Sequence, residues 1–173
     1  MGGVVWFVGS EMHSRGSKAQ RPKGSEAHDL TPQPATRHDL GVKLEHVALQ
    51  VADPVGLSRW YVEQLGLTVK RAQTASPFGH FLADDGDAVM LEFYGNPKIA
   101  VPDYARMEPM VLHLAFHVED VPGTRARLIK AGATPVGEVE SNDVGDEVAM
   151  LRDPWGIPVQ LVKRRDRMIG VRP

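Results

Sequence analysis

Two stretches of the chain, about 67 residues apart, carry nearly the same text, and each contains a histidine. They read LEHVALQVAD and VLHLAFHVED, with His46 in the first aligned to His113 in the second. Later in each half an apolar segment holds one polar residue, Glu92 in the first half and Gln160 in the second. The spacing from histidine to polar residue agrees to within one position. The sequence therefore predicts a duplicated unit that sets one histidine and one glutamate or glutamine at matched places.

These four residues have the chemistry of a metal site. Imidazole nitrogen together with carboxylate or amide oxygen suits a divalent ion, and Zn, Ni, Co, Mn and Fe are all candidates. A lone strand histidine is more often a hydrogen-bonded structural residue, and a lone glutamate fits a salt-bridged carboxylate. Because all four recur at matched positions, we predict that His46, Glu92, His113 and Gln160 bind one metal ion. Glu92 is the only carboxylate of the set, so it is the candidate catalytic base.

Four further residues are predicted to contact substrate or to support the ligands from behind. His117 faces the same way as His113 in an alternating strand, and Gln50 mirrors it in the first half. For both, a hydrogen-bonded structural role is an equally good interpretation. Met90 and Phe116 are interpreted as core side chains or as lining of the substrate cavity.

Regular elements must position these residues. Residues 42–51 alternate between polar and apolar side chains, which is typical of a strand. Asp53 and Asp120 stand where a carboxylate can cap a helix start, with proline close behind, and Gly66 and Gly132 are placed to end these helices. Further strands are predicted at 67–72, 79–83, 88–94, 134–139, 147–151 and 157–162. Each half is thus a β-α-β-β-β unit of an α+β fold, too small to bury much core alone, so the two halves must pair.

Composition divides the chain into an arm and one domain. Residues 1–41 hold scattered proline, serine and glycine without an apolar period, which predicts a disordered N-terminal arm. Residues 42–166 are predicted to form a single domain with modules at about 42–105 and 109–166. Residues 167–173 form a short tail.

Bulk composition excludes several classes of function. Cysteine is absent, which rules out disulfides, thiolate metal sites and cysteine nucleophiles. With 20 basic and 22 acidic residues the net charge is −2, so no nucleic-acid partner is expected. The apolar run near the start is too short to span a membrane and lacks the charges of a secretory signal. We therefore expect a cytoplasmic protein whose partner is a small-molecule substrate.

The motifs LEHVA, MLEF, LHLAF and RDPWGIPVQL resemble those of the vicinal oxygen chelate superfamily, over roughly residues 42–165. This superfamily includes glyoxalase I, bleomycin-resistance proteins and extradiol dioxygenases. The resemblance implies two paired βαβββ modules that form a cupped mixed sheet, closed within one chain or across a homodimer. It also implies that the first and last strands of each module carry the metal ligands. Gln160 departs from the commonest pattern, which has glutamate there.

Three functions follow from this resemblance. The leading hypothesis is a divalent-metal-dependent lyase or isomerase of the glyoxalase type, acting on a small substrate with adjacent oxygens through an enediolate-like intermediate. The alternative is a metal-free small-molecule or drug-binding (resistance) protein, whose apolar cup would be lined by Met90, Phe116, Tyr94 and Trp60. An extradiol-type dioxygenase is disfavoured, because Gln160 leaves its facial triad of two histidines and a carboxylate incomplete.

Overall fold

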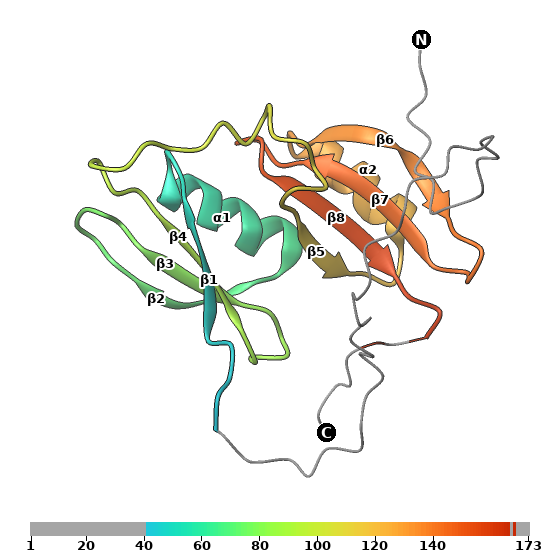
Figure 1. Ribbon diagram of the computed structural model, residues 1–173, viewed down its shortest axis with the longest axis horizontal. Helices are drawn as coiled ribbons and strands as arrows, with labels where there is room; N and C mark the ends of the chain where they lie inside the picture. The colour runs from blue at the N-terminus through green and yellow to red at the C-terminus, as the bar shows by residue number, and fades with distance from the viewer. Residues whose placement is uncertain (1–40, 167, 169–173) are drawn as a thin grey trace, which may run out of the picture. The chain divides into compact units, whose positions relative to one another are not determined.

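A computed structural model of the protein describes residues 41–166 and 168, which form two βαβββ modules in succession (Figure 1). The first module comprises β1 (His46–Gln50), α1 (Pro54–Leu65), β2 (Thr68–Ala72), β3 (His80–Ala83) and β4 (Met90–Tyr94). The second comprises β5 (Leu114–His117), α2 (Val121–Lys130), β6 (Thr134–Ser141), β7 (Glu147–Arg152) and β8 (Pro158–Lys163). The predicted arm, up to residue 40, lies outside the described residues, as does most of the predicted tail.

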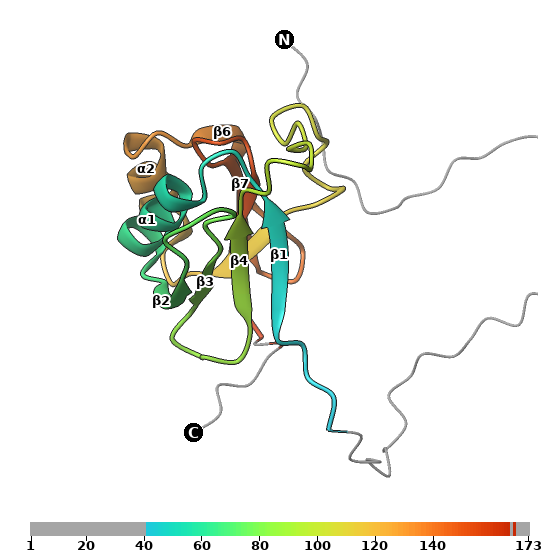
Figure 2. The same cartoon turned by 90° about the vertical axis from the view of Figure 1, so that its left-hand side faces the viewer.

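Each module forms its own four-stranded mixed sheet, with the strand orders β1-β4-β3-β2 and β5-β8-β7-β6. The first and last strands of each module run parallel, as β1 and β4 do in Figure 2, and the other neighbours are antiparallel. This arrangement places β1 and β5 at the edges of their sheets. It confirms the predicted α+β fold of two βαβββ modules. The predicted opening strand was too long, because β1 begins at His46 instead of residue 42.

Both helices begin at the predicted carboxylate caps. Asp53 accepts a hydrogen bond from the Gly56 N–H at 2.9 Å, and Asp120 accepts one from the Gly123 N–H at 2.9 Å. Gly66 ends α1 in a left-handed conformation with φ 73°, as predicted. The end of α2 differs from the prediction, since Ala131 is its C-cap and the left-handed glycine follows one residue later.

A single buried core joins the two modules. Because side chains alternate between the two faces of a strand, Leu49 and Phe93 of the first sheet and Leu161 of the second point to the helix side. They pack there in one hydrophobic cluster with residues of both helices. The indole N–H of Trp60 in α1 donates to the carbonyl of Ala131 at the end of α2, at 2.9 Å. The modules therefore pack through the faces of their sheets that carry the helices, which leaves the opposite faces for the polar residues. None of the helices in the described part of the chain is long and apolar enough to cross a membrane.

A buried carboxylate adds a polar link between the modules. Asp153, in the turn between β7 and β8, is only 3% exposed and accepts a hydrogen bond from the Tyr61 hydroxyl of α1 at 3.0 Å. It also accepts the backbone N–H groups of Trp155 and Ile157, both at 2.9 Å. Burial raises the pKa of Asp153 to about 6, against the lowering effect of these hydrogen bonds. Burial likewise raises the pKa of Tyr61 well above its ordinary value.

Candidate metal centre

In the first module, His46 and Glu92 lie together on the face turned away from the core. Ala48 of β1 is the register partner of Glu92 in β4, so His46 and Glu92 point to the same side of the sheet. The Nε2 atom of His46 lies 3.4 Å from Oε2 of Glu92. Their side chains are 37% and 20% exposed, so a small molecule can reach both. The structure therefore brings these two of the four predicted ligands together.

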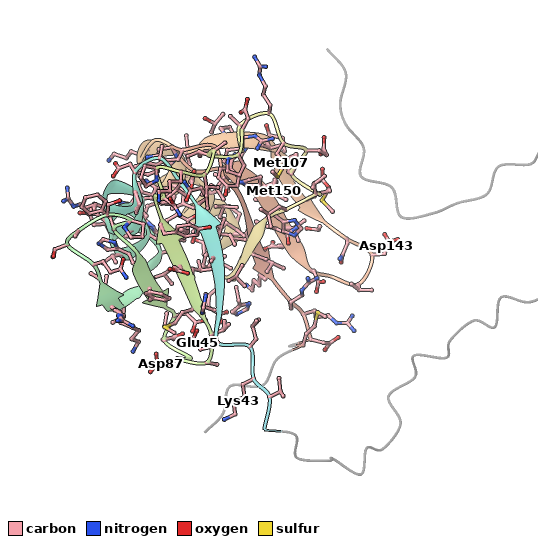
Figure 3. All side chains as sticks on the ribbon, turned by 60° about the vertical axis from the view of Figure 1, so that its left-hand side comes forward. Lys43, Glu45, Asp87, Met107, Asp143 and Met150 are labelled. Atoms are coloured by element: carbon pink, nitrogen blue, oxygen red, sulfur yellow. The ribbon has the colours of Figure 1, made fainter. Side chains whose placement is uncertain are left out.

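Two further side chains hold the His46 ring. Oε2 of Glu45 contacts Nδ1 of the ring on the side opposite Glu92. The ring of Phe81, the β3 neighbour of Glu92, packs edge-on against the imidazole with centroids 5.5 Å apart. The hydrogen bond with Glu45 raises the pKa of His46, and the charges of Glu45 and Glu92 add to this while desolvation opposes it. Figure 3 shows Glu45 at the start of β1.

In the second module the matching residues have neutral partners. His113 stands directly before β5, and its Nδ1 atom lies 3.2 Å from the backbone carbonyl oxygen of Pro109. Gln160 in β8 is the register partner of Ala115 in β5 and of Met150 in β7. It therefore shares a face with Ala115 and points away from Leu161, which is fully buried in the core. This is the face predicted for a ligand.

The structure does not gather the four predicted ligands around one point. Within residues 41–166 and 168, no three histidine, aspartate or glutamate side chains are arranged so that one ion could contact them all. The structure brings His46 and Glu92 together in the first module, and it places His113 and Gln160 in the second. We call each of these pairs a half-site. Metal binding by all four residues stays a prediction.

Gln50 and His117 have identifiable partners of their own. The Gln50 amide, only 7% exposed, donates to the carbonyls of Asn96 and Ile99 and accepts the Asn96 N–H at 2.9 Å. These bonds fix the segment that leaves β4, which gives Gln50 a structural task. His117 faces the same way as Gln160 and lies 3.2 Å from Oε1 of Glu119. Contact of either residue with substrate stays a prediction.

The apolar residues predicted to line the cup divide between the two faces. Met90 shares the face of Glu92, two positions along β4, as expected for a lining residue. Of the two positions left open for Phe116, the structure has the core one, because Phe116 alternates with Ala115 and its ring packs against Tyr61 with centroids 6.1 Å apart. Trp60 was placed wrongly, because it is buried against the end of α2.

Sequence reasoning missed two residues of this centre, Glu45 and Phe81. Phe81 could have been found, because β3 pairs with β4 and register places Phe81 beside Glu92. Glu45 gave no such signal. Strict alternation sends it to the face opposite His46, and its contact depends on the chain lying outside the regular strand at that point.

Comparison with known proteins shows which family shares this architecture. A family model described as a glyoxalase-like domain matches residues 46–162. Among solved structures, SMU.1112c is 30% identical with a TM-score of 0.53, covering 70% of this chain and 97% of that chain.

Two further structures are similar in fold. A glyoxalase/bleomycin resistance protein/dioxygenase family enzyme from Burkholderia phytofirmans PsJN is 19% identical with a TM-score of 0.58, over 70% of this chain and 98% of that one. TnmS3, an antibiotic binding protein from Streptomyces sp. CB03234, is 22% identical with a TM-score of 0.55, over 71% and 96%. No curated protein matches the sequence. The family match covers both modules and all four predicted ligand positions, and the chain therefore belongs to the glyoxalase-like family of the vicinal oxygen chelate superfamily.

Proposed function

We propose that the protein is a divalent-metal-dependent lyase or isomerase of the glyoxalase type, acting on a small substrate with two adjacent oxygens. One observation carries the proposal. In both modules Nδ1 of the predicted ligand histidine faces an oxygen acceptor, Glu45 Oε2 for His46 and the Pro109 carbonyl for His113. Metal-binding histidines characteristically donate their second ring N–H to such an oxygen, which leaves the other nitrogen with its lone pair free.

The residues of the first half-site fit a cation. With a proton on Nδ1, Nε2 of His46 presents a lone pair to the carboxylate oxygen of Glu92, 3.4 Å away. Two electron-pair donors facing each other repel unless a proton or a metal ion lies between them. Imidazole, carboxylate and amide oxygen together suit Zn, Ni, Co, Mn or Fe, with Gln160 and His113 supplying the second pair of ligands.

A bound divalent ion would supply Lewis acidity, which lowers the pKa of a carbon acid beside two adjacent oxygens. Glu92 then takes the proton from that carbon, and the C–H electron pair moves into the neighbouring carbonyl to give an enediolate-like intermediate of the substrate. Glu92 returns the proton to the adjacent carbon in an isomerisation. Phe81 and Met90 flank Glu92 on the same face, and its carboxylate is 20% exposed, so the proton it takes can exchange with solvent.

The two half-sites meet across a homodimer. The helix-side faces of both sheets are already occupied by the shared core, and His46 and Glu92 form no three-residue group with any other described acid or histidine. Within the part of the chain that the structure describes, the outer edges of β1 and β5 pair with no other strand, so they offer backbone groups to a second copy. Exposed apolar residues stand just ahead of these strands, namely Leu44, Met110 and Val111.

Mixing two inactive variants tests this arrangement. In a heterodimer of His46→Ala and His113→Ala subunits, one shared site would carry both lesions and the other would keep all four ligands. We expect Zn²⁺ binding to reappear, to about half of the heterodimer's sites, after the two variants are unfolded and refolded together. No recovery, with heterodimers confirmed by mass spectrometry, would place the site within one chain.

The reaction class is tested by proton exchange. The full chain, purified without an affinity tag, is analysed for metal and then incubated in D₂O with a panel of small α-hydroxycarbonyl compounds. We expect about one transition ion per chain, and loss of the C–H proton signal that depends on Glu92, with Glu92→Gln inactive. A protein that takes up no metal yet binds apolar drugs would favour the binding protein instead. Iron retained with ring-cleaving activity would favour the dioxygenase.

A further inference from the structure

We infer that Glu45 is a positioning residue of the metal centre, an inference that rests on the proposed metal-dependent function. Its carboxylate accepts the Nδ1–H of His46 and thereby holds the ring in the one tautomer whose Nε2 lone pair points to Glu92. Glu45 itself touches neither the metal nor the substrate. It acts through His46.

The fold explains how a sequence neighbour reaches this ring. Neighbouring residues in a strand point to opposite faces, so Glu45 and His46 would separate in a regular strand. Glu45 precedes β1, while its carbonyl still accepts the Met90 N–H at 2.9 Å, which anchors its backbone beside β4. Because β1 is an edge strand, no other strand of the described residues lies on its outer side, and the Glu45 side chain can curl round to His46.

The His46 ring is then fixed at three points. Glu45 holds Nδ1, Glu92 faces Nε2, and the Phe81 ring packs against the imidazole at an angle of 86°. Among the described residues, the Glu45 carboxylate forms no ion pair other than the one with His46. Its 66% exposed side chain therefore has no stabilising task elsewhere that would account for its position.

The second module supports the same assignment by contrast. The residue that precedes His113 is Leu112, whose side chain has no acceptor, and the Pro109 carbonyl takes the place of the carboxylate at Nδ1. Both rings thus have an oxygen at Nδ1, but only His46 has a charged one. A carboxylate makes the imidazole a stronger electron donor than a neutral carbonyl does, so Glu45 makes His46 the stronger of the two nitrogen ligands.

The test compares Glu45→Ala and Glu45→Gln in the full chain, with Glu63→Gln as a control that removes one exposed charge from the outer side of α1. Zn²⁺ affinity is measured by competition with a chelator at fixed pH. We expect Glu45→Ala to weaken binding on the order of 10–100-fold. Glu45→Gln should lose less, because its amide oxygen still accepts the Nδ1–H, and Glu63→Gln should match the unmodified chain. Equal affinities for Glu45→Ala and the control would overturn the assignment.

A second readout does not need the metal. Ring ¹⁵N spectra of the metal-free chain, at one pH where the rings are neutral, report which nitrogen of His46 carries the proton. We expect the Nδ1–H form in the unmodified chain and a mixture of tautomers in Glu45→Ala, while His113 stays unchanged in both. An unchanged His46 tautomer in Glu45→Ala would overturn the role of Glu45. A chain that keeps this tautomer but takes up no Zn²⁺ would instead overturn the proposed function, so the two failures are distinguishable.

Discussion

The two modules share a plan but differ in charge at the place where they would bind a metal. Around His46 the first module sets two carboxylates, Glu45 and Glu92. In the second module His113 faces the Pro109 carbonyl, and Gln160 on the same face of the sheet carries a neutral amide. In both modules Nδ1 of the histidine faces an oxygen atom. The difference teaches that the duplicated fold fixes ligand geometry, while single residues decide where negative charge collects.

This division of charge has a chemical consequence. With two neutral histidines, one glutamate and one glutamine, a divalent ion would keep a net charge near +1 in its shell. That shell is more electrophilic than one with two carboxylates. In that shell the first module would provide most of the affinity and the base, and the second would complete the shell without neutralising it.

The largest expected effect is on Zn²⁺ affinity, and it should differ between the two predicted polar ligands, Glu92 and Gln160. Glu92→Ala should weaken Zn²⁺ binding about 1,000-fold, because it removes the only charged ligand, and Gln160→Ala about 10-fold, since charge-assisted contacts are the stronger ones. Chelator competition on both variants gives the two numbers. Similar losses for the two would mean that the halves contribute equally, contrary to the charge comparison.

The next largest effect is on the free energy of unfolding, through the buried carboxylate of Asp153 that links the modules. The pKa of Asp153 is raised to about 6 from an ordinary 3.8, so the folded state holds its proton more tightly than the unfolded chain. The stability from this group is present below pH 3.8 and is lost as the pH rises through 6. The loss is on the order of 3 kcal/mol. Urea unfolding across this range, repeated with Asp153→Asn, should show the slope only in the unmodified chain.

A smaller loss of stability is expected when Tyr61, the hydrogen-bond partner of Asp153 in α1, is changed. Tyr61→Phe removes the hydroxyl that donates to Asp153 and should lower the free energy of unfolding by about 2 kcal/mol. Tyr94→Phe, on β4, is the matched control and should change stability by less than about 0.5 kcal/mol. Equal effects in denaturant unfolding would show that the link between the modules does not depend on this hydrogen bond.

The smallest effect on Zn²⁺ affinity is expected when both modules carry a glutamate at the matched position. Gln160→Glu gives the second module a carboxylate where the first has one, so Zn²⁺ binding should tighten about 10-fold, which corresponds to about 1.4 kcal/mol. Proton exchange of substrate could change in either direction, because the variant has a second base but a weaker electrophile. Unchanged affinity would remove residue 160 from the shell and leave His46, Glu92 and His113.

Much of the architecture could be predicted because local rules decide it. The repeat, the caps at Asp53 and Asp120 and the turn at Gly66 depend on neighbours in sequence. The face shared by His46 and Glu92 follows from the period of two in strands. The position of Phe116 stayed open between core and cup, because its apolar character fits both equally well. Only its alternation with Ala115, set by pairing with β8, decides between them.

Other features depend on geometry that no local pattern encodes. Glu45 reaches His46 only because β1 starts one residue later and lies at a sheet edge. The hydrogen bonds of Gln50 depend on the course of the segment after β4, which places Asn96 and Ile99 beside it. The proposed meeting of the two half-sites would depend on the arrangement of whole modules, which residue spacing does not specify.

One titration tests most directly that both halves bind a single ion. Zn²⁺ is added to the metal-free full chain while the ring ¹⁵N signals of His46 and His113 are followed, each assigned by its alanine variant. We predict that Nε2 of both rings shifts together and that both shifts are complete at one equivalent per chain. Shifts of His46 alone, or of neither ring, would contradict a shared site.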